Sequence, residues 1–224
     1  MPAAIEERKA ETRDMIMLAA RKVFSEKGYH KAQISDIVKE AGISTGSIYA
    51  HFKDKRDLFE QVSRENLQTL RTQLQDLRKT TRPDDFSGRV ETWKLTYSAF
   101  FDFVDRYPQE LLMIVRGGFG VDEDHDQSLW AFFYAFAEDM ARDFQKWMDL
   151  GFLQGLNPFL MGQITVGMCL QTAHSYIEDR KFSRREAINT LMALNSAMFS
   201  IYLTDMGRKE LGDLSVPQLP EHEE

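Results

Sequence analysis

Carboxylate and imidazole side chains crowd into one short stretch of this chain, DEDHD at residues 122–126. Carboxylate groups are good ligands for hard metal ions such as calcium. A calcium-binding loop, however, requires glycine at its sixth position and glutamate at its twelfth. Counted from Asp122, those positions hold Gln127 and Phe133. The stretch is therefore predicted to be a solvated acidic loop rather than a metal site.

Two further groups of residues fail the same kind of test. RGGFG at residues 116–120 lacks the Gly-Lys-Ser/Thr sequence and the preceding strand of a phosphate-binding loop. Cys169 and His174 are five residues apart, whereas a metal-binding pair on a helix is four apart, so both are read as packing or pocket wall. No Ser/His/Asp or paired-carboxylate arrangement is present. We predict no catalytic residue, metal ion or cofactor, and no enzyme activity.

The stretch AGISTGSIYAHFKDKRDLF, residues 41–59, has a different kind of chemistry. Gly42 is expected to end one short helix, and Ser44 or Thr45 to cap another that ends near His51. This is the spacing of a helix-turn-helix, in which small side chains at the start of the second helix permit close approach to a DNA groove. Tyr49 and His51 are predicted on the outward side, within reach of phosphates or base edges.

The elements around this motif are all expected to be helical, because apolar residues recur at helical spacing and no alternating strand pattern is found. A stripe from Ile16 to Phe24 predicts a first helix that stops at Gly28. Asp54 is placed to cap a helix that begins at Lys55, whose charge there favours a phosphate. About nine helices are expected in an all-α fold, over residues 5–27, 34–41, 44–51, 55–79, 93–104, 108–116, 129–147, 158–179 and 184–206.

Composition limits the class of protein. A hydrophobic content of 43% is sufficient for a buried core, and a single cysteine, Cys169, fits a reducing cytosol. Polar residues interrupt the longest uncharged run, 151–176, so neither a membrane span nor a membrane partner is expected. Residues 1–60 carry a net charge of +1 and the remainder −8. A nucleic-acid partner then requires basic groups gathered on one face. The predicted location is the cytoplasm.

The motif has a family resemblance. The elements G-Y, D-I-x-x-x-A-G-I-S and G-S-I-Y-x-H-F-x-x-K-x-x-L, within residues 19–59, resemble the DNA-binding segment of the tetracycline-repressor (TetR/AcrR) family. The resemblance implies that Lys55 holds a phosphate. It further implies that a set of six residues faces DNA: Ser44, Thr45, Gly46, Ser47, Tyr49 and His51.

One departure from the family pattern lies just before the motif. Ala32-Gln33 stands where the family usually carries two threonines. Ala32 has no side chain that can cap the second helix, so the cap falls to Gln33, to Ser35 or to neither. Gln33 is also a candidate to replace a threonine–phosphate contact.

Large aromatic residues and methionines are concentrated beyond residue 90. Taken singly each is more often a core residue, but together they indicate a pocket for an apolar ligand, with an acyl chain or acyl thioester as one candidate. Arg116 is equally suited to anchor an anionic head group or to form a surface salt bridge. The candidate ligand-binding residues are Trp93, Tyr97, Phe100, Phe101, Arg116, Phe119, Phe133, Phe136, Met140 and Met168.

The last two long helices predict a dimer. Their apolar stripes are wider than one neighbouring helix covers, so pairing with a second copy in a four-helix bundle is expected. The candidate interface residues are Phe159, Gly162, Val166, Ile188, Leu191, Met192, Asn195, Met198, Phe199 and Tyr202.

These features together predict a homodimeric repressor of the TetR type. Residues 1–54 form the three-helix DNA-binding head, 55–210 the ligand-binding and dimerisation domain, and 211–224 a disordered tail. The dimer binds a double-stranded, pseudo-palindromic operator and is released by a small apolar effector. Two alternatives remain at this point. One is a DNA-binding activator or architectural protein without a ligand. The other is a helical carrier or enzyme for apolar molecules whose helix-turn-helix is incidental.

Overall fold

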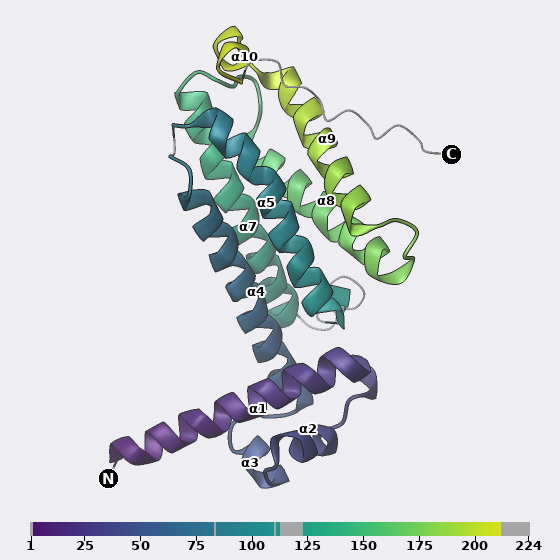
Figure 1. Ribbon diagram of the computed structural model, residues 1–224. Coiled ribbons are helices and arrows are strands. Elements are labelled where there is room, and N and C mark those ends of the chain that lie inside the picture. The colour runs from purple at the N-terminus through teal and green to yellow at the C-terminus, as the bar shows by residue number, and fades with distance from the viewer. Residues whose placement is uncertain (1, 83, 110, 113–122, 212–224) are drawn as a thin grey trace. The chain divides into compact units, whose positions relative to one another are not determined.

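The computed structural model describes residues 2–82, 84–109, 111, 112 and 123–211. Within these residues every regular element is helical, and the one extended contact is an isolated bridge between Leu153 and Leu203 (Figure 1). The nine helices of the described residues confirm the predicted all-α fold class. None of them has both the length and the apolar character that a bilayer crossing demands.

The chain divides into two compact units. The first contains the residues up to Thr69 and a short segment that starts at Tyr107; the second contains Leu70–Arg106 and the described residues from 123 onward. Helix α4 (Lys55–Lys79) contributes to both, because its first turns place Leu58 and Phe59 in the core of the first unit. The domain boundary expected at residue 54 stays a prediction.

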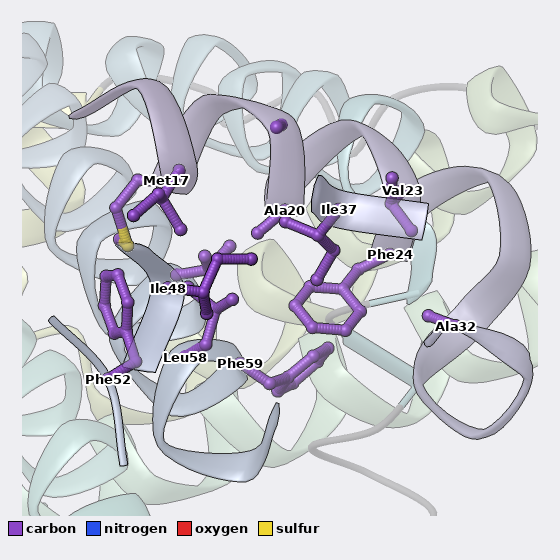
Figure 2. Packing of buried hydrophobic residues seen from close by; sticks show 13 residues of the cluster. Met17, Ala20, Val23, Phe24, Ala32, Ile37, Ile48, Phe52, Leu58 and Phe59 are labelled. Carbon is purple, nitrogen blue, oxygen red and sulfur yellow. The ribbon is translucent and has the colours of Figure 1, made fainter. Parts of the chain in front are cut away.

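Three helices and the start of α4 enclose the core of the first unit: α1 (Pro2–Lys31), α2 (Ile34–Ala41) and α3 (Thr45–Tyr49). Figure 2 shows Phe24, Ile37 and Phe59 converging between these helices. Phe24 and Phe59 meet edge to face, with ring centroids 4.8 Å apart. The predicted apolar stripe of the first helix, Ile16 to Phe24, is confirmed as core.

Two glycines set the ends of the head helices, as predicted. Gly28 has a φ of 72° and interrupts α1, and Gly42 has a φ of 66° and caps the C-terminus of α2. A side chain at either position would be strained, because L-residues with a Cβ rarely adopt this left-handed region.

Local polar groups fix where the next helices begin. Gln33 is the N-cap residue of α2, and its backbone N–H donates to Asp36 Oδ2 at 3.0 Å. Asp54 Oδ1 accepts from the backbone N–H of Asp57 at 2.8 Å, which confirms the predicted cap of α4. Such caps satisfy backbone N–H groups that have no partner within the helix.

The second unit is built from α5 (Phe86–Arg106), α7 (Glu123–Asp149), α8 (Pro158–Glu178), α9 (Arg184–Tyr202) and α10 (Asp205–Leu211), together with the end of α4. Helices α7 and α8 pack closely, and α9 packs against α5 and α8. The predicted cap at Asn157 and the predicted capping box between Ser183 and Glu186 are both formed.

Two expectations about these elements are wrong. From Glu123 on, the predicted acidic loop is the start of α7, while Asp122 lies outside the described residues. The last helix does not run to Met206: α9 ends at Tyr202, Leu203 is extended and bridges to Leu153, and α10 follows. The predicted helix over 108–116 falls mostly outside the described residues, as does the predicted disordered tail.

Candidate DNA-binding surface and effector cavity

Helix α3 has one buried side and one exposed side. Ile48 and, just beyond the helix, Phe52 lie in the core of the head, at 0% and 1% exposure. Thr45 and Tyr49 are one turn apart on the opposite side, and Tyr49 is 54% exposed. Because its inner side is fixed in a packed core, α3 presents a hydroxyl and a phenol outward in a defined orientation, as a recognition helix requires.

Ser44, rather than Thr45, caps this helix. Its Oγ accepts from the backbone N–H of Ser47 at 3.1 Å, and the two serine hydroxyls lie 2.8 Å apart. A Cβ at Gly46 would meet only Ser44 Oγ, at 3.8 Å, so packing within the head does not require glycine there. Its small size instead leaves room for a close approach from outside, as expected of a helix that enters a groove.

Lys55 is engaged inside the head. Its ammonium donates to the carbonyl oxygens of Tyr29 at 2.9 Å and Ala32 at 3.0 Å, and lies 4.4 Å from the centre of the Tyr29 ring. These contacts join the start of α4 to the turn between α1 and α2. An ammonium has three donors, so one N–H is left over from these two bonds. The phosphate contact implied for Lys55 stays a prediction.

The other predicted contacts lie at the edges of this surface. Gln33 is exposed, and its Oε1 accepts from Ser35 Oγ at 3.4 Å. Ser47 and His51 are half-buried, and the His51 ring lies beside that of Phe52. Lys31 and Lys53 are exposed in the same unit and add positive charge, which phosphate binding requires. No sequence pattern had singled out these two lysines.

A cavity of about 40 Å³ lies inside the second unit, between α4, α5, α7, α8 and α9. Its volume corresponds to about three water molecules. Three of the predicted ligand-binding residues line it, namely Trp93, Tyr97 and Met140. The remaining lining residues are Arg78, Arg89, Thr92, Thr96, Asp143, Phe144, Trp147, Thr165 and Asn195.

The other predicted ligand-binding residues that the structure describes do not line this cavity. Met168 instead lines a separate groove between α8 and α9. Four aromatic residues of α5 and α7 lie elsewhere in the unit, three of them buried and Phe136 half-buried: Phe100, Phe101, Phe133 and Phe136. Arg116 and Phe119 lie outside the described residues. The pocket for an apolar ligand that these residues were expected to form together stays a prediction.

One side of the cavity is charged. Arg78 Nε lies 3.4 Å from Asp143 Oδ2. The Arg89 guanidinium donates to the carbonyl oxygens of Arg78 and Thr81, at the end of α4. Sequence reasoning missed these three charged groups. A signal was present in α7, where Asp143 is one helical turn from Met140 and next to Phe144, within a stretch rich in aromatic residues.

Asp139, a second carboxylate of α7, differs from Asp143 in its hydrogen bonds and in its pKa. Asp139 accepts from Arg71 Nε at 2.7 Å and from Gln75 Nε2 at 2.9 Å. Burial raises the pKa of Asp139, but the hydrogen bonds from Arg71 and Gln75 outweigh it, so that the pKa lies below its ordinary value. For Asp143, burial dominates and raises the pKa despite the nearby Arg78. Asp143 is therefore the more weakly held of the two.

Exposed apolar residues form one continuous face on α8 and α9. They recur every three or four positions on each helix, and a groove lined by both helices includes Gly167 of α8 and Leu194 of α9. We call this surface the α8–α9 face; it consists of Leu160, Ile164, Gly167, Leu194, Ala197 and Ile201.

Half of the predicted dimer-interface residues lie inside their own unit rather than on this face. Five are buried within their own unit: Gly162, Ile188, Leu191, Asn195 and Phe199. Their assignment to a free surface is wrong, because α5 and α7 already cover that side of the two helices; Phe199, for example, packs on Trp93 and Phe144. Phe159 is exposed, and the remaining four are half-buried: Val166, Met192, Met198 and Tyr202.

The single cysteine is enclosed by the same packing. Burial raises the pKa of the Cys169 thiol to about 12. Because the thiolate is the reactive form, we expect native protein at pH 8 to react with Ellman's reagent roughly 1,000-fold more slowly than the unfolded chain. Absorbance will report one thiol per chain in guanidinium. Rapid stoichiometric labelling of protein with an unchanged circular dichroism spectrum would contradict this burial. The described residues contain no group of three or more His, Cys, Asp or Glu suited to a metal ion.

Comparison with known proteins covers both parts of the chain. Residues 16–62 match the profile described as "Bacterial regulatory proteins, tetR family". The HTH-type transcriptional repressor BepR of Brucella suis is 45% identical over 53 residues, which are 24% of this chain and 25% of BepR. The chain spans 48% of two further curated regulators. An HTH-type transcriptional regulator of Staphylococcus aureus (strain USA300) is 25% identical over 89% of this chain and 97% of its own length.

Solved structures share the fold of most of the chain. The transcriptional regulator FadR from Bacillus subtilis, in complex with stearoyl-CoA, superposes with a TM-score of 0.66 at 22% identity, over 80% of this chain and 95% of its own. The printed descriptions of these relatives are those of transcriptional regulators, and none of them is described as an enzyme.

Proposed function

We propose that this chain, whose N-terminal head belongs to the tetR family of bacterial regulatory proteins, is a cytoplasmic, homodimeric transcriptional repressor. An effector releases it from its operator. The observation that carries the proposal is the outward side of α3. Thr45 and Tyr49 stand exposed there, on a helix whose other side is buried through Ile48. Side chains in this position read base edges and contact phosphates.

The dimer forms through the α8–α9 face. Its exposed leucines and isoleucines make an unpartnered apolar patch along two long helices, and such patches mark association sites. A two-fold axis through this face pairs four helices and presents two heads. If the heads occupy successive turns of one side of DNA, the half-site centres lie about 34–36 Å apart.

The effector binds at the cavity of the second unit. A ligand that fits one arrangement of its helices better than another shifts the population between the two, and weakens operator binding by that difference in affinity. FadR was solved with stearoyl-CoA, and an acyl chain or acyl thioester is one candidate here. A cavity of about 40 Å³ is too small for such a chain, so its entry requires the helices to separate.

The small volume of the cavity also supports a second candidate function. A DNA-binding activator or architectural protein without an effector needs only a filled core, and most of the aromatic residues in the second unit are packed against one another. Thermal-shift screening with fatty acids, acyl thioesters and aromatic acids separates the two functions. A regulator with an effector is expected to give at least one stabilising compound that also releases DNA.

The recognition role of α3 is tested by Tyr49→Ala. We expect about tenfold weaker binding to operator and non-operator DNA alike, because a single contact to the phosphate backbone is lost. Thr45→Val is expected instead to change the preference among operator variants, since its hydroxyl faces base edges. Fluorescence anisotropy with fragments selected from genomic DNA measures both.

The matched control is Tyr134→Ala, which removes a tyrosine of the second unit that is 44% exposed, against 54% for Tyr49. It should leave DNA affinity unchanged. If Tyr49→Ala binds DNA like the wild type while the head remains folded, the recognition surface lies elsewhere.

A further inference from the structure

Two buried polar atoms at the cavity lack hydrogen-bond partners among the described residues: Arg89 Nε, a donor, and Asn195 Oδ1, an acceptor. Both residues are 5% exposed. An unsatisfied polar atom in a protein interior costs free energy, and a native structure that keeps one usually has a reason to do so. A donor and an acceptor left over at the same cavity point to a ligand that supplies the complements.

Four other polar side chains of the lining already form hydrogen bonds within the unit. The hydroxyls of Thr92, Thr96 and Thr165 donate to backbone carbonyls of their own helices. Asn195 Nδ2 donates to the hydroxyl oxygen of Tyr97. Besides the charged pair of Arg78 and Asp143, a ligand therefore meets one unpaired guanidinium N–H, of Arg89, and one unpaired amide oxygen, of Asn195.

The charge at the cavity favours an anion. Arg78 and Arg89 carry two positive charges, and Asp143 carries one negative charge. The ion pair of Arg78 with Asp143 is long, at 3.4 Å, in contrast to the two short hydrogen bonds from Arg71 to Asp139, at 2.7 and 3.1 Å. A carboxylate entering the cavity can thus replace Asp143 beside Arg78 and accept from Arg89 Nε, so that it pairs with two guanidinium groups through charge-assisted hydrogen bonds.

The apolar walls favour a flat ligand. Trp93, Phe144, Trp147 and Met140 supply apolar side chains to the lining of the cavity. Methionine is flexible and readily repacks, so a ring enlarges the cavity by moving Met140. Planar aromatic groups stack well on such walls.

We propose that the cavity binds a small hydroxylated aromatic carboxylate. Its carboxylate accepts from Arg89 Nε and displaces Asp143 from Arg78, while its hydroxyl donates to Asn195 Oδ1. The inference rests on the proposed function, for which it names the effector class. It also supplies the regulation, because Arg78 lies on α4, and the first turns of that same helix hold core residues of the head. In one arrangement Arg78 of α4 pairs with Asp143, and in the other it pairs with the ligand. A ligand that binds only the second arrangement shifts the population toward it, as an effector must.

Titration of the full-length protein with three probes tests this chemistry: 4-hydroxybenzoate, benzoate and 4-hydroxybenzyl alcohol. Tryptophan fluorescence reports binding, since Trp93 and Trp147 line the cavity. We expect 4-hydroxybenzoate to bind below about 1 mM and each of the other two roughly tenfold more weakly, because each leaves one buried group unpaired. Asn195→Ala should abolish the preference for 4-hydroxybenzoate over benzoate.

Asp143→Asn is expected to raise the affinity for carboxylates, a result that a misfolded protein would not give. Removal of the competing charge should tighten binding of both carboxylates by about tenfold and leave the alcohol unaffected, as one pKa unit of like-charge interaction implies. Asp149→Asn, which removes an exposed carboxylate of the same helix, is the matched control and should change nothing. Unchanged carboxylate binding in Asp143→Asn would overturn the proposal, and so would a wild-type protein that binds oleate but none of the three probes.

DNA binding, measured separately, keeps this proposal distinct from the function it rests on. A protein that binds 4-hydroxybenzoate with the Asp143→Asn gain, yet binds no DNA, upholds the site and refutes the repressor. A protein that binds its operator and ignores all three probes upholds the repressor and refutes the site.

Discussion

The double substitution Leu194→Glu with Ile201→Glu is expected to produce a monomer that binds operator DNA roughly 100-fold more weakly than the wild type. The two side chains are 50% and 74% exposed and lie two turns apart on α9. In the proposed dimer they face a second copy across the two-fold axis, where four buried glutamates have no partners. Loss of the dimer separates the two heads, so the second half-site no longer adds to affinity. Sedimentation velocity gives the oligomeric state, and anisotropy gives the DNA affinity.

The control is Asn189→Glu, which adds the same charge at an exposed position of α9 outside the α8–α9 face. It should remain dimeric and bind normally. A charge at Phe199 would be a poor test, because Phe199 is 2% exposed and packs on Trp93 and Trp147, so its loss unfolds the unit. Dimers that persist in the double variant, or a wild-type monomer that binds one half-site tightly, would show that the face has another role.

The features that the sequence predicted correctly are those that depend on neighbours a few residues apart. The breaks at Gly28 and Gly42 follow from backbone conformations that favour glycine. The caps at Asp54, Asn157 and Ser183 need only a side-chain oxygen next to the first turn of a helix. The head was predicted in most detail because it consists almost entirely of such signals.

The side of α8 that faces the core could not be predicted from the sequence. Apolar residues occupy nearly every side of this helix, so their spacing does not distinguish the side that faces the core from the side that remains exposed. The sequence indicated a close helix contact at Gly162 but not which helix makes it. The structure places that contact with Ala137 of α7, and the exposed stripe through Leu160 and Ile164 lies on another side.

The charged part of the cavity was missed because it depends on pairs distant in sequence. Arg78 and Asp143 are 65 residues apart, and only the packing of α4 against α7 brings them together. The end of α9 has a similar cause: Leu203 leaves the helix to bridge with Leu153, although the apolar spacing continues to Met206. A helix pattern in one segment contains no information about such partners.

Replacing glycine by alanine is expected to change the stability of the protein in opposite directions at two positions of α8, Gly162 and Gly167. A Cβ at Gly162 would lie 2.4 Å from the carbonyl oxygen of Ala137, which is backbone and cannot turn away. Gly162→Ala must push α7 and α8 apart, and we expect it to lower the free energy of unfolding by about 2–3 kcal/mol. At Gly167 a Cβ would meet nothing within 4 Å. Gly167→Ala should therefore raise the free energy of unfolding by roughly 0.5–1 kcal/mol, because alanine favours the helix.

Both substitutions are best measured by urea unfolding in the Leu194→Glu/Ile201→Glu chain, so that a partner subunit near Gly167 does not contribute. Equal dependence on urea in the three proteins will show that only stability has changed. A loss at both positions, or at neither, would mean that helix propensity rather than the approach to Ala137 decides the outcome. Opposite signs would establish that the glycine at 162 is needed for the α7–α8 crossing. That crossing would then depend on the absence of a side chain at residue 162.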